Sequence, residues 1–281
     1  MNGMTRRDFL KMGAGCGIAT GLTGLTGLLY SAGVEPNKVL VERQTIHLRR
    51  LPTCFDGFKV VLLSDLHLYP FTTVELIREA IGLANSVQPD LVVLAGDFVY
   101  KSAEAAFDLV PLFEKLNPAK GVFAVLGNHD HWRGPKIVSE ALAKGGVQLL
   151  NNRGVELRIA SESIYLAGID SFMAGTPRLS EAFSARKGAL CSIALVHEPD
   201  SIRKLCTEVP LDLQLSGHSH GGQVRLPGFG PLVLPQFGQI YDLGLYEVGH
   251  AQIYTTRGIG TVGLPIRFNC PPEVTAITLR A

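Results

Sequence analysis

The chain has 281 residues, of which 46% are hydrophobic and 18% are charged, and this predicts a single globular domain with a sizeable core. Its formal net charge of +1 gives no nucleic-acid footprint, so we expect no nucleic-acid partner. The cysteines are odd in number and form no C-x-x-C pair, which argues against a zinc ribbon and a complete disulfide framework: Cys16, Cys54, Cys191, Cys206 and Cys270.

Residues 1–33 differ from the rest of the chain. Thr5-Arg6-Arg7-Asp8-Phe9-Leu10-Lys11 resembles a twin-arginine export signal, and Met12–Tyr30 follows as an uncharged run. This pattern predicts export by the twin-arginine translocation machinery to the periplasm, the cell wall or the outer face of the cytoplasmic membrane. The alternative is a single membrane-spanning anchor, and the sequence leaves open whether the segment is cleaved or retained. We expect the folded domain over residues 34–281.

Strands and helices alternate through the first half of this domain. Short apolar runs predict buried strands, and segments with apolar residues on one helical face predict helices. Such alternation is typical of a layered α/β domain. The predicted elements are an edge strand over Pro36–Leu48, strands over Lys59–Ser64, Leu91–Ala95 and Val122–Leu126, a helix capped by Thr72 or Thr73 that ends near Ser86, and helices over Ser102–Leu116 and Pro135–Lys144.

From Val147 onward the strands follow one another more closely. This spacing predicts a second set of strands, antiparallel or mixed, in place of further strand–helix–strand units. The predicted strands are Val147–Leu150, Val155–Ile159, Ile164–Ala167, Ala189–Val196, Leu213–Ser216, Ala251–Thr256 and Val274–Leu279, and the predicted helices are Leu179–Lys187 and Ser201–Cys206.

Residues of the metal-ligand type follow five of the apolar runs, before the next helix begins. The carboxyl end of a strand is where α/β sheets bind ligands. Six of the eight histidines lie in these segments, although a lone histidine is most often a surface or satisfied core residue. Carboxylate, amide oxygen and imidazole together suit divalent ions. The residues are Asp65, His67, Asp97, Asn128, His129, Asp130, His131, His197, His218 and His220.

In order along the chain, these motifs resemble the calcineurin-like metallophosphoesterase family. The matching pieces are Asp65-x-His67, Gly96-Asp97, Gly127-Asn128-His129-Asp130, His197 and Gly217-His218-Ser219-His220. Later segments, among them Arg267-Phe268-Asn269-Cys270-Pro271-Pro272-Glu273, resemble its exported bacterial YkuE/YaeI-like subgroup. The resemblance implies an α/β fold with four layers, an α/β/β/α sandwich of two mixed sheets.

The resemblance also implies roles for single residues. It assigns Asp65, His67 and His220 to one metal ion, Asn128, His197 and His218 to a second, and Asp97 to both. His129 is expected to stabilise phosphoryl charge or protonate the leaving oxygen, with Asp130 orienting its ring. The alternative for Asp130 is a carboxylate at a helix N-terminus. The two divalent ions could be manganese, iron, zinc, cobalt or nickel.

The implied activity is metal-dependent hydrolysis of a phosphate ester, most simply a phosphodiester of the cell envelope, by a monomer. The alternatives are a membrane-associated pyrophosphatase of a nucleotide-sugar lipid of the UDP-diacylglucosamine type and a non-catalytic scaffold with the same fold. His131 and Trp132 could face substrate or belong to the rim of the site.

Two further features admit two interpretations each. Arg225, Arg257 and Arg267 could clamp a phosphate or form surface salt bridges. The apolar stretch Pro227–Tyr241 could form a lip for a lipid-bearing substrate or a membrane surface, and we expect a loop that folds onto the domain.

Overall fold

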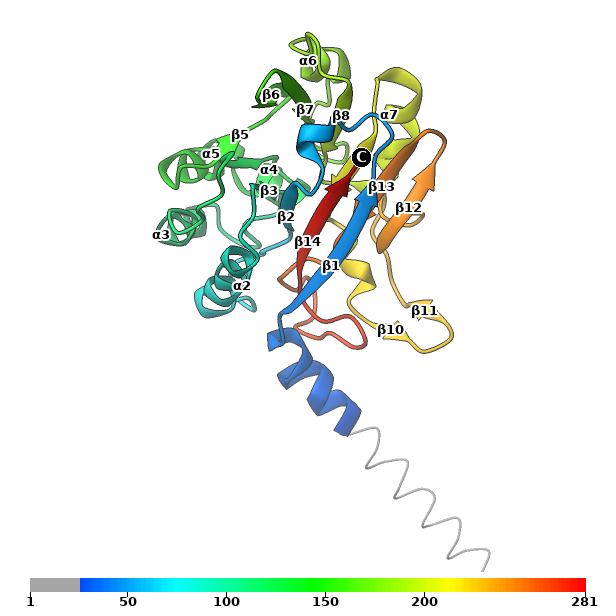
Figure 1. The fold of residues 1–281 in the computed structure, drawn as a ribbon. Helices are drawn as coiled ribbons and strands as arrows, with labels where there is room; N and C mark the ends of the chain where they lie inside the picture. The colour runs from blue at the N-terminus through cyan, green and yellow to red at the C-terminus, as the bar shows by residue number, and fades with distance from the viewer. Residues whose placement is uncertain (1–25) are drawn as a thin grey trace, which may run out of the picture.

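The computed structural model describes residues 26–281, so the twin-arginine motif, Cys16 and most of the uncharged run lie outside the described residues. Residues 26–33 form a helix that leads into the domain (Figure 1). Among the described residues, no helix has the length and apolar character needed to cross a membrane. The described cysteines are all free thiols: Cys54, Cys191, Cys206 and Cys270.

The first sheet carries the amino-terminal strands together with the last strand of the chain. The strands predicted at residues 147–150 and 274–279 were expected in the second set, but both pair within this first sheet. The four strands at residues 59–63, 91–94, 122–124 and 148–149 run parallel to one another. The last strand of the chain, β14 (Glu273–Arg280), lies antiparallel to β2 (Lys59–Leu63) and parallel to the edge strand β1 (Leu40–His47), so the sheet is mixed. The order across it is β1 (Leu40–His47), β14 (Glu273–Arg280), β2 (Lys59–Leu63), β3 (Leu91–Leu94), β4 (Val122–Ala124) and β5 (Gln148–Leu149).

The second sheet carries the later strands and is also mixed. Its four inner strands are parallel, and each edge strand is antiparallel to its neighbour. The order is β12 (Gly244–Val248), β13 (Ala251–Thr255), β9 (Leu213–Ser216), β8 (Cys191–Leu195), β7 (Glu162–Gly168) and β6 (Arg153–Ile159).

Three hydrophobic clusters separate four layers. One lies between the first sheet and its helices, one between the two sheets, and one between the second sheet and its helices. Successive side chains of a strand point to opposite faces, and on β2 Val60 and Leu62 therefore pack between the sheets while Val61 and Leu63 pack under the helices. The predicted α/β/β/α sandwich is confirmed. Its helices are α2 (Val74–Ser86), α3 (Val110–Phe113), α5 (Pro135–Lys144), α6 (Leu179–Phe183) and α7 (Ile202–Glu208) (Figure 1).

Several elements differ from the prediction. The helix expected over Ser102–Leu116 is a 3-10 segment, η3 (Glu104–Leu109), followed by the single turn α3, because Pro111 is accepted in the first turn of a helix but not in its interior. We expected no helix to begin before Asp130, yet α4 (Asn128–Arg133) begins at Asn128. The sequence also gave no signal for β12 or for the hairpin of β10 (Arg225–Leu226) and β11 (Gly230–Pro231).

The close packing of β7 predicts a contrast between two glycines. A Cβ on Gly168 would meet the carbonyl oxygen of Leu150 at 2.1 Å, whereas a Cβ on Gly82 in α2 meets nothing within 4 Å. We expect Gly168→Ala to lower the free energy of unfolding by about 1–3 kcal/mol through overpacking, and Gly82→Ala to raise it by about 0.5–1 kcal/mol. Urea unfolding with a metal chelator present measures both, and equal effects would contradict the packing described here.

Candidate metal centre

Both sheets deliver their metal-ligand residues to one place. The loops that leave the carboxyl ends of three strands of the first sheet meet the loops that leave two strands of the second. The predicted residues follow β2 (Asp65 and His67), β3 (Asp97), β4 (Asn128), β8 (His197) and β9 (His218 and His220), and all are buried. The sequence therefore predicted correctly that they converge.

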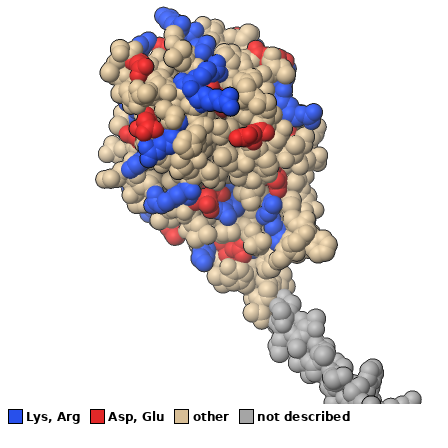
Figure 2. Space-filling view, turned by 45° about the vertical axis from the view of Figure 1, so that its right-hand side comes forward, with Lys and Arg blue, Asp and Glu red and all other residues tan. Residues whose placement is uncertain are grey.

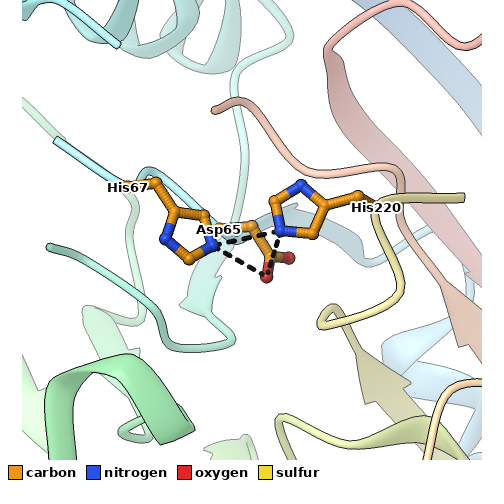
Figure 3. A group of neighbouring side chains, drawn as sticks. All are labelled: Asp65, His67 and His220. Carbon is orange, nitrogen blue, oxygen red and sulfur yellow. Dashed lines mark hydrogen bonds and ion pairs between the residues drawn. The ribbon is translucent and has the colours of Figure 1, made fainter. Parts of the chain in front are cut away.

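Asp65, His67 and His220 form the first cluster (Figure 3). The Nε2 atoms of the two histidines lie 3.0 Å apart. The Asp65 Oδ1 lies 3.8 Å from the His67 Nε2 and 3.5 Å from the His220 Nε2. Only one proton fits between two facing imidazole nitrogens, whereas a cation can accept the lone pairs of both. The donor set therefore fits a divalent metal ion.

The second cluster contains Asp97, His197 and His218. The Nδ1 of His197 lies 2.7 Å from the carbonyl oxygen of Ala95, and the Nε2 of His218 lies 2.7 Å from that of Gln236. Donation of these N–H groups to carbonyls leaves a lone pair on the opposite nitrogen of each ring, and these two nitrogens face each other at 3.2 Å. Both rings are thus held in the tautomer that binds a metal.

Asn128 completes this side of the site. Its Oδ1 is buried and has no hydrogen-bond partner. An unpaired buried amide oxygen is costly, and a bound cation would remove that cost. Asn128 lines the same cavity as Asp97 and His218, so its free oxygen suits the ligand role that the sequence motif predicts.

Asp97 belongs to the second cluster and also contacts His67 of the first. Its Oδ2 lies 3.4 Å from the His67 Nε2 and 3.1 Å from the His197 Nε2, and its Oδ1 accepts a hydrogen bond from the His129 backbone N–H at 2.8 Å. This is the position that a carboxylate between two ions requires. His129 is also close: its ring centroid lies 4.8 Å from that of His67, and with His67 and Asp97 it forms a third group of potential metal ligands.

Most of these residues adopt a backbone conformation that only glycine adopts easily. Positive φ angles of 43° to 70° occur at five of the seven predicted ligands: Asp65, His67, Asp97, His218 and His220. Strain of this kind is concentrated at functional sites, where the surrounding structure enforces it. No sequence pattern predicts it, because the residue types themselves disfavour it.

The charges of the site are unbalanced without a cation. Burial raises the pKa of Asp65 to about 6 and lowers the pKa of His67 to about 3. Burial also acts on Asp97 and His197, but their mutual attraction outweighs it, so the pKa of Asp97 falls well below its usual range and that of His197 rises. A bound cation would compensate the buried carboxylate charges and take the lone pairs of the imidazoles.

Asp130 has a different role from the one that we expected. Its Oδ2 accepts hydrogen bonds from the backbone N–H groups of Asp97 at 2.8 Å and Gly127 at 2.9 Å, and its Oδ1 accepts from that of Phe98 at 2.9 Å. The ring Nδ1 of His129 has no hydrogen-bond partner. Asp130 is thus the alternative that the sequence allowed, a carboxylate at a helix N-terminus, and it fixes the Asp97 loop and not the His129 ring.

The three arginines do not clamp a phosphate. Arg225 pairs with Asp242, and Arg257 pairs with Glu273 and with Glu42. Arg267 is fully buried, so it is not a surface ion pair either. Its guanidinium donates to the backbone carbonyls of Cys270, Arg257, Gly258 and Gly260, which belong to the loop behind Asp65.

A cavity of about 530 Å³ opens above the clusters. His129 lines it together with metal-ligand residues, and Trp132 lies on its wall and is 51% exposed. His131 points elsewhere: its Nε2 lies 2.7 Å from the Asp170 Oδ1, and this contact raises the pKa of the imidazole. Of the two residues that could face substrate, only Trp132 lines the cavity.

The stretch Pro227–Tyr241 folds onto the domain only in its later part, where the backbone N–H groups of Gln239 and Tyr241 donate to the Asp200 carboxylate. Phe229 is 88% exposed and Val233 is 76% exposed, and Leu232 and Ile240 are also exposed. Sequence reasoning also missed Met173 on the cavity wall and the two carbonyl groups that orient His197 and His218. Backbone carbonyls carry no residue-specific signal, so no sequence pattern could have identified them.

The sequence is similar to a known protein family and to individual bacterial proteins. Residues 58–222 match the calcineurin-like phosphoesterase family. The chain is 38% identical to the uncharacterised metallophosphoesterase YkuE of Bacillus subtilis, over all of this chain and 99% of that protein. It is 34% identical to the phosphodiesterase YaeI of Escherichia coli, over 79% of this chain and 82% of that protein.

A solved structure supports the fold alone. The sulfate thiohydrolase SoxB of Thermus thermophilus superposes with a TM-score of 0.52 at 13% identity, over 82% of this chain and 57% of that chain. At this identity the likeness concerns the arrangement of sheets and helices and not the reaction.

The shared position of Asp97 predicts the metal content of two variants. Asp97→Ala should lose both ions, because the carboxylate faces both clusters. Asp170→Asn is the matched control, since Asp170 is a buried carboxylate outside both clusters. Metal analysis of protein purified without chelator should find two ions per chain in the parent and in the control. Full occupancy in Asp97→Ala would exclude the bridging role.

Proposed function

Because the chain belongs to the calcineurin-like phosphoesterase family, we propose that it hydrolyses phosphodiesters with two divalent metal ions that share Asp97. The observation that carries this proposal is the pair of neighbouring ligand clusters, in which Asp97 of the second cluster also lies 3.4 Å from the His67 Nε2 of the first. The similarity to the phosphodiesterase YaeI supports a diester as substrate.

The ligands divide naturally between the two ions. Asp65, His67 and His220 would hold one ion, and His197, His218 and the Asn128 oxygen would hold the other. This mixture of imidazole and oxygen ligands suits manganese, iron, zinc, cobalt or nickel. When bound, the two ions supply Lewis acidity for the phosphoryl oxygens and lower the pKa of an attacking water.

The residues of the chain then act around a bound ester. His129 lies beside the first cluster, with its ring 5.0 Å from that of Trp132, and its side-chain Nδ1 is free of other hydrogen bonds. It can donate a hydrogen bond to a phosphoryl oxygen or a proton to the leaving oxygen. Asp130 acts indirectly, because it fixes the loop that carries Asp97.

A cell-envelope substrate is part of the proposal, and the twin-arginine motif supports it. A pyrophosphatase of a nucleotide-sugar lipid is the second candidate, favoured by the apolar side chains of Leu232, Val233 and Leu264 on the cavity wall. The scaffold alternative is disfavoured, because a protein without catalysis has no need to keep every predicted ligand buried in one site.

A hydrolysis screen of the metal-reconstituted protein tests the activity, and His129→Ala tests the mechanism. We expect the parent to cleave aryl and alkyl phosphodiesters faster than the corresponding monoesters.

His129→Ala should keep both ions and lose activity by about 10²–10⁴-fold. If His129 is the proton donor, the loss shrinks for nitrophenolate leaving groups, and if it stabilises charge the loss is the same for all. Near-full activity of His129→Ala on every ester would contradict the proposed role of His129.

The proposed location makes a separate prediction. Arg6→Lys combined with Arg7→Lys should keep the protein in the cytoplasm, because twin-arginine export reads both guanidinium groups. Cell fractionation with an antibody against the folded domain measures this, and Lys11→Arg serves as a control with the motif arginines intact. Export of the double variant at the parental level would mean another route or a plain membrane anchor.

A further inference from the structure

Three segments without a single charged residue lie near the cavity: two of them line it, and the first lies beside the third. They are residues 26–34, 226–241 and 258–266, and together we call them the uncharged rim. Most of the large hydrophobic side chains that are exposed in the described chain belong to it: Leu28, Leu29, Tyr30, Val34, Leu226, Phe229, Leu232, Val233, Ile240 and Leu264.

Hydrogen bonds from the residues that flank the segments of the uncharged rim hold these segments near one another. The backbone N–H of Arg267 donates to the carbonyl of Ser31 at 2.8 Å. The Gln223 side chain, just before the second segment, exchanges two hydrogen bonds with the backbone of Val262 in the third. The helix of residues 26–33 and the hairpin of β10 and β11 lie at the same end of the domain (Figure 1).

The rim continues into the cavity. Leu232, Val233 and Leu264 are more than half exposed and also line the cavity wall. The metal-ligand residues form its polar floor. A ligand that fits both parts has a phosphate ester at one end and an apolar chain at the other.

We propose that the uncharged rim rests on a lipid bilayer, so that the substrate enters from the membrane as a phosphodiester with an apolar tail. This inference rests on the proposed function, which supplies the reaction at the floor of the cavity. A contiguous exposed apolar patch on a domain of this kind marks an interaction surface. Each exposed Leu, Val or Phe side chain favours transfer into an apolar phase.

The uncharged sequence that leads into the domain favours a lipid bilayer as the partner of the uncharged rim. No charged residue lies between Lys11 and Glu35, so the first segment of the rim continues an uncharged stretch of sequence. A stretch of this length and character partitions into lipid. In Figure 2 the visible end of the domain beside this segment is also largely without Lys, Arg, Asp and Glu, in contrast to the rest of that face.

The single tryptophan of the chain provides the test. Trp132 lines the cavity at its mouth, so its fluorescence reports contact of the rim with lipid. The full-length protein is mixed with vesicles of phosphatidylethanolamine and phosphatidylglycerol that carry brominated acyl chains. We expect the emission of Trp132 to shift to the blue and to be quenched by bromine.

Two matched variants locate the contact. Phe229→Asp places a charge on the rim at a side chain that is 88% exposed and does not line the cavity. Leu190→Asp changes a side chain that is 62% exposed and lies just before β8, at the opposite end of that strand from His197. We expect weaker quenching in Phe229→Asp and parental quenching in Leu190→Asp.

A pair of esters with the same reacting bond links docking to catalysis. Hexadecyl p-nitrophenyl phosphate in the vesicles is compared with methyl p-nitrophenyl phosphate in solution, both with the manganese-loaded protein. Phe229→Asp should lower the ratio of the two rates at least about tenfold, and Leu190→Asp should not change it.

Each failure has its own signature. An unquenched Trp132 in the parent, or an equal loss in Leu190→Asp, overturns the bilayer as occupant. A dimer that forms without vesicles and is lost in Phe229→Asp also overturns it, because the rim would then bind a second copy of the chain. If the parent cleaves neither ester, the proposed function fails, while bromine quenching still decides whether the rim meets lipid.

Discussion

The position of the Asp97 carboxylate is the constraint on which the site depends. Its backbone has a φ of 56°, and Gly96 before it has a φ of 93°. The opposing residue must be a glycine, because a Cβ on Gly127 would lie 2.1 Å from the Asp97 Oδ1. Asp130 accepts hydrogen bonds from both Asp97 and Gly127, so one buried carboxylate fastens the loop after β3 to the start of α4. The bridging position thus results from contacts between two loops of the same sheet.

The two sheets make this arrangement complete. Asp97 comes from the first sheet, whereas His197, which it faces, comes from the second, and the cluster of Asp65 and His220 also joins the two. Buried carboxylates and imidazoles that face one another without a cation destabilise the folded protein. A bound metal ion would remove this destabilisation and so contribute to folding free energy. Ion binding would therefore be coupled to the packing of the two sheets.

Much of the architecture could be predicted from local sequence. Runs of four or five apolar residues identified the inner strands, because strands buried on both faces need no polar alternation. The metal-ligand residues could be located because each follows such a run directly. The same reasoning failed at Ser102–Leu116, where Pro111 leaves only short turns, and at β12, where exposed and half-buried residues form an edge strand.

The parts of the site that depend on tertiary contacts could not be predicted. Asp130 is adjacent to His129 in sequence, but its partners are backbone amides of the loop after β3. Arg267 resembles a phosphate ligand in the sequence, and only the fold shows that backbone carbonyls surround it. The exposure of Phe229 was also missed, because composition alone does not distinguish an apolar loop that packs inward from one that faces out.

The central claim is that Asp97 lies between two ions, and electron paramagnetic resonance of the manganese-reconstituted protein tests it most directly. Two Mn²⁺ ions that share a carboxylate are coupled by exchange, and at full loading we predict the multiline spectrum of a coupled pair. The spectrum of isolated Mn²⁺ ions at full loading would contradict the account, because the two clusters would then hold their ions independently or only one of them would bind.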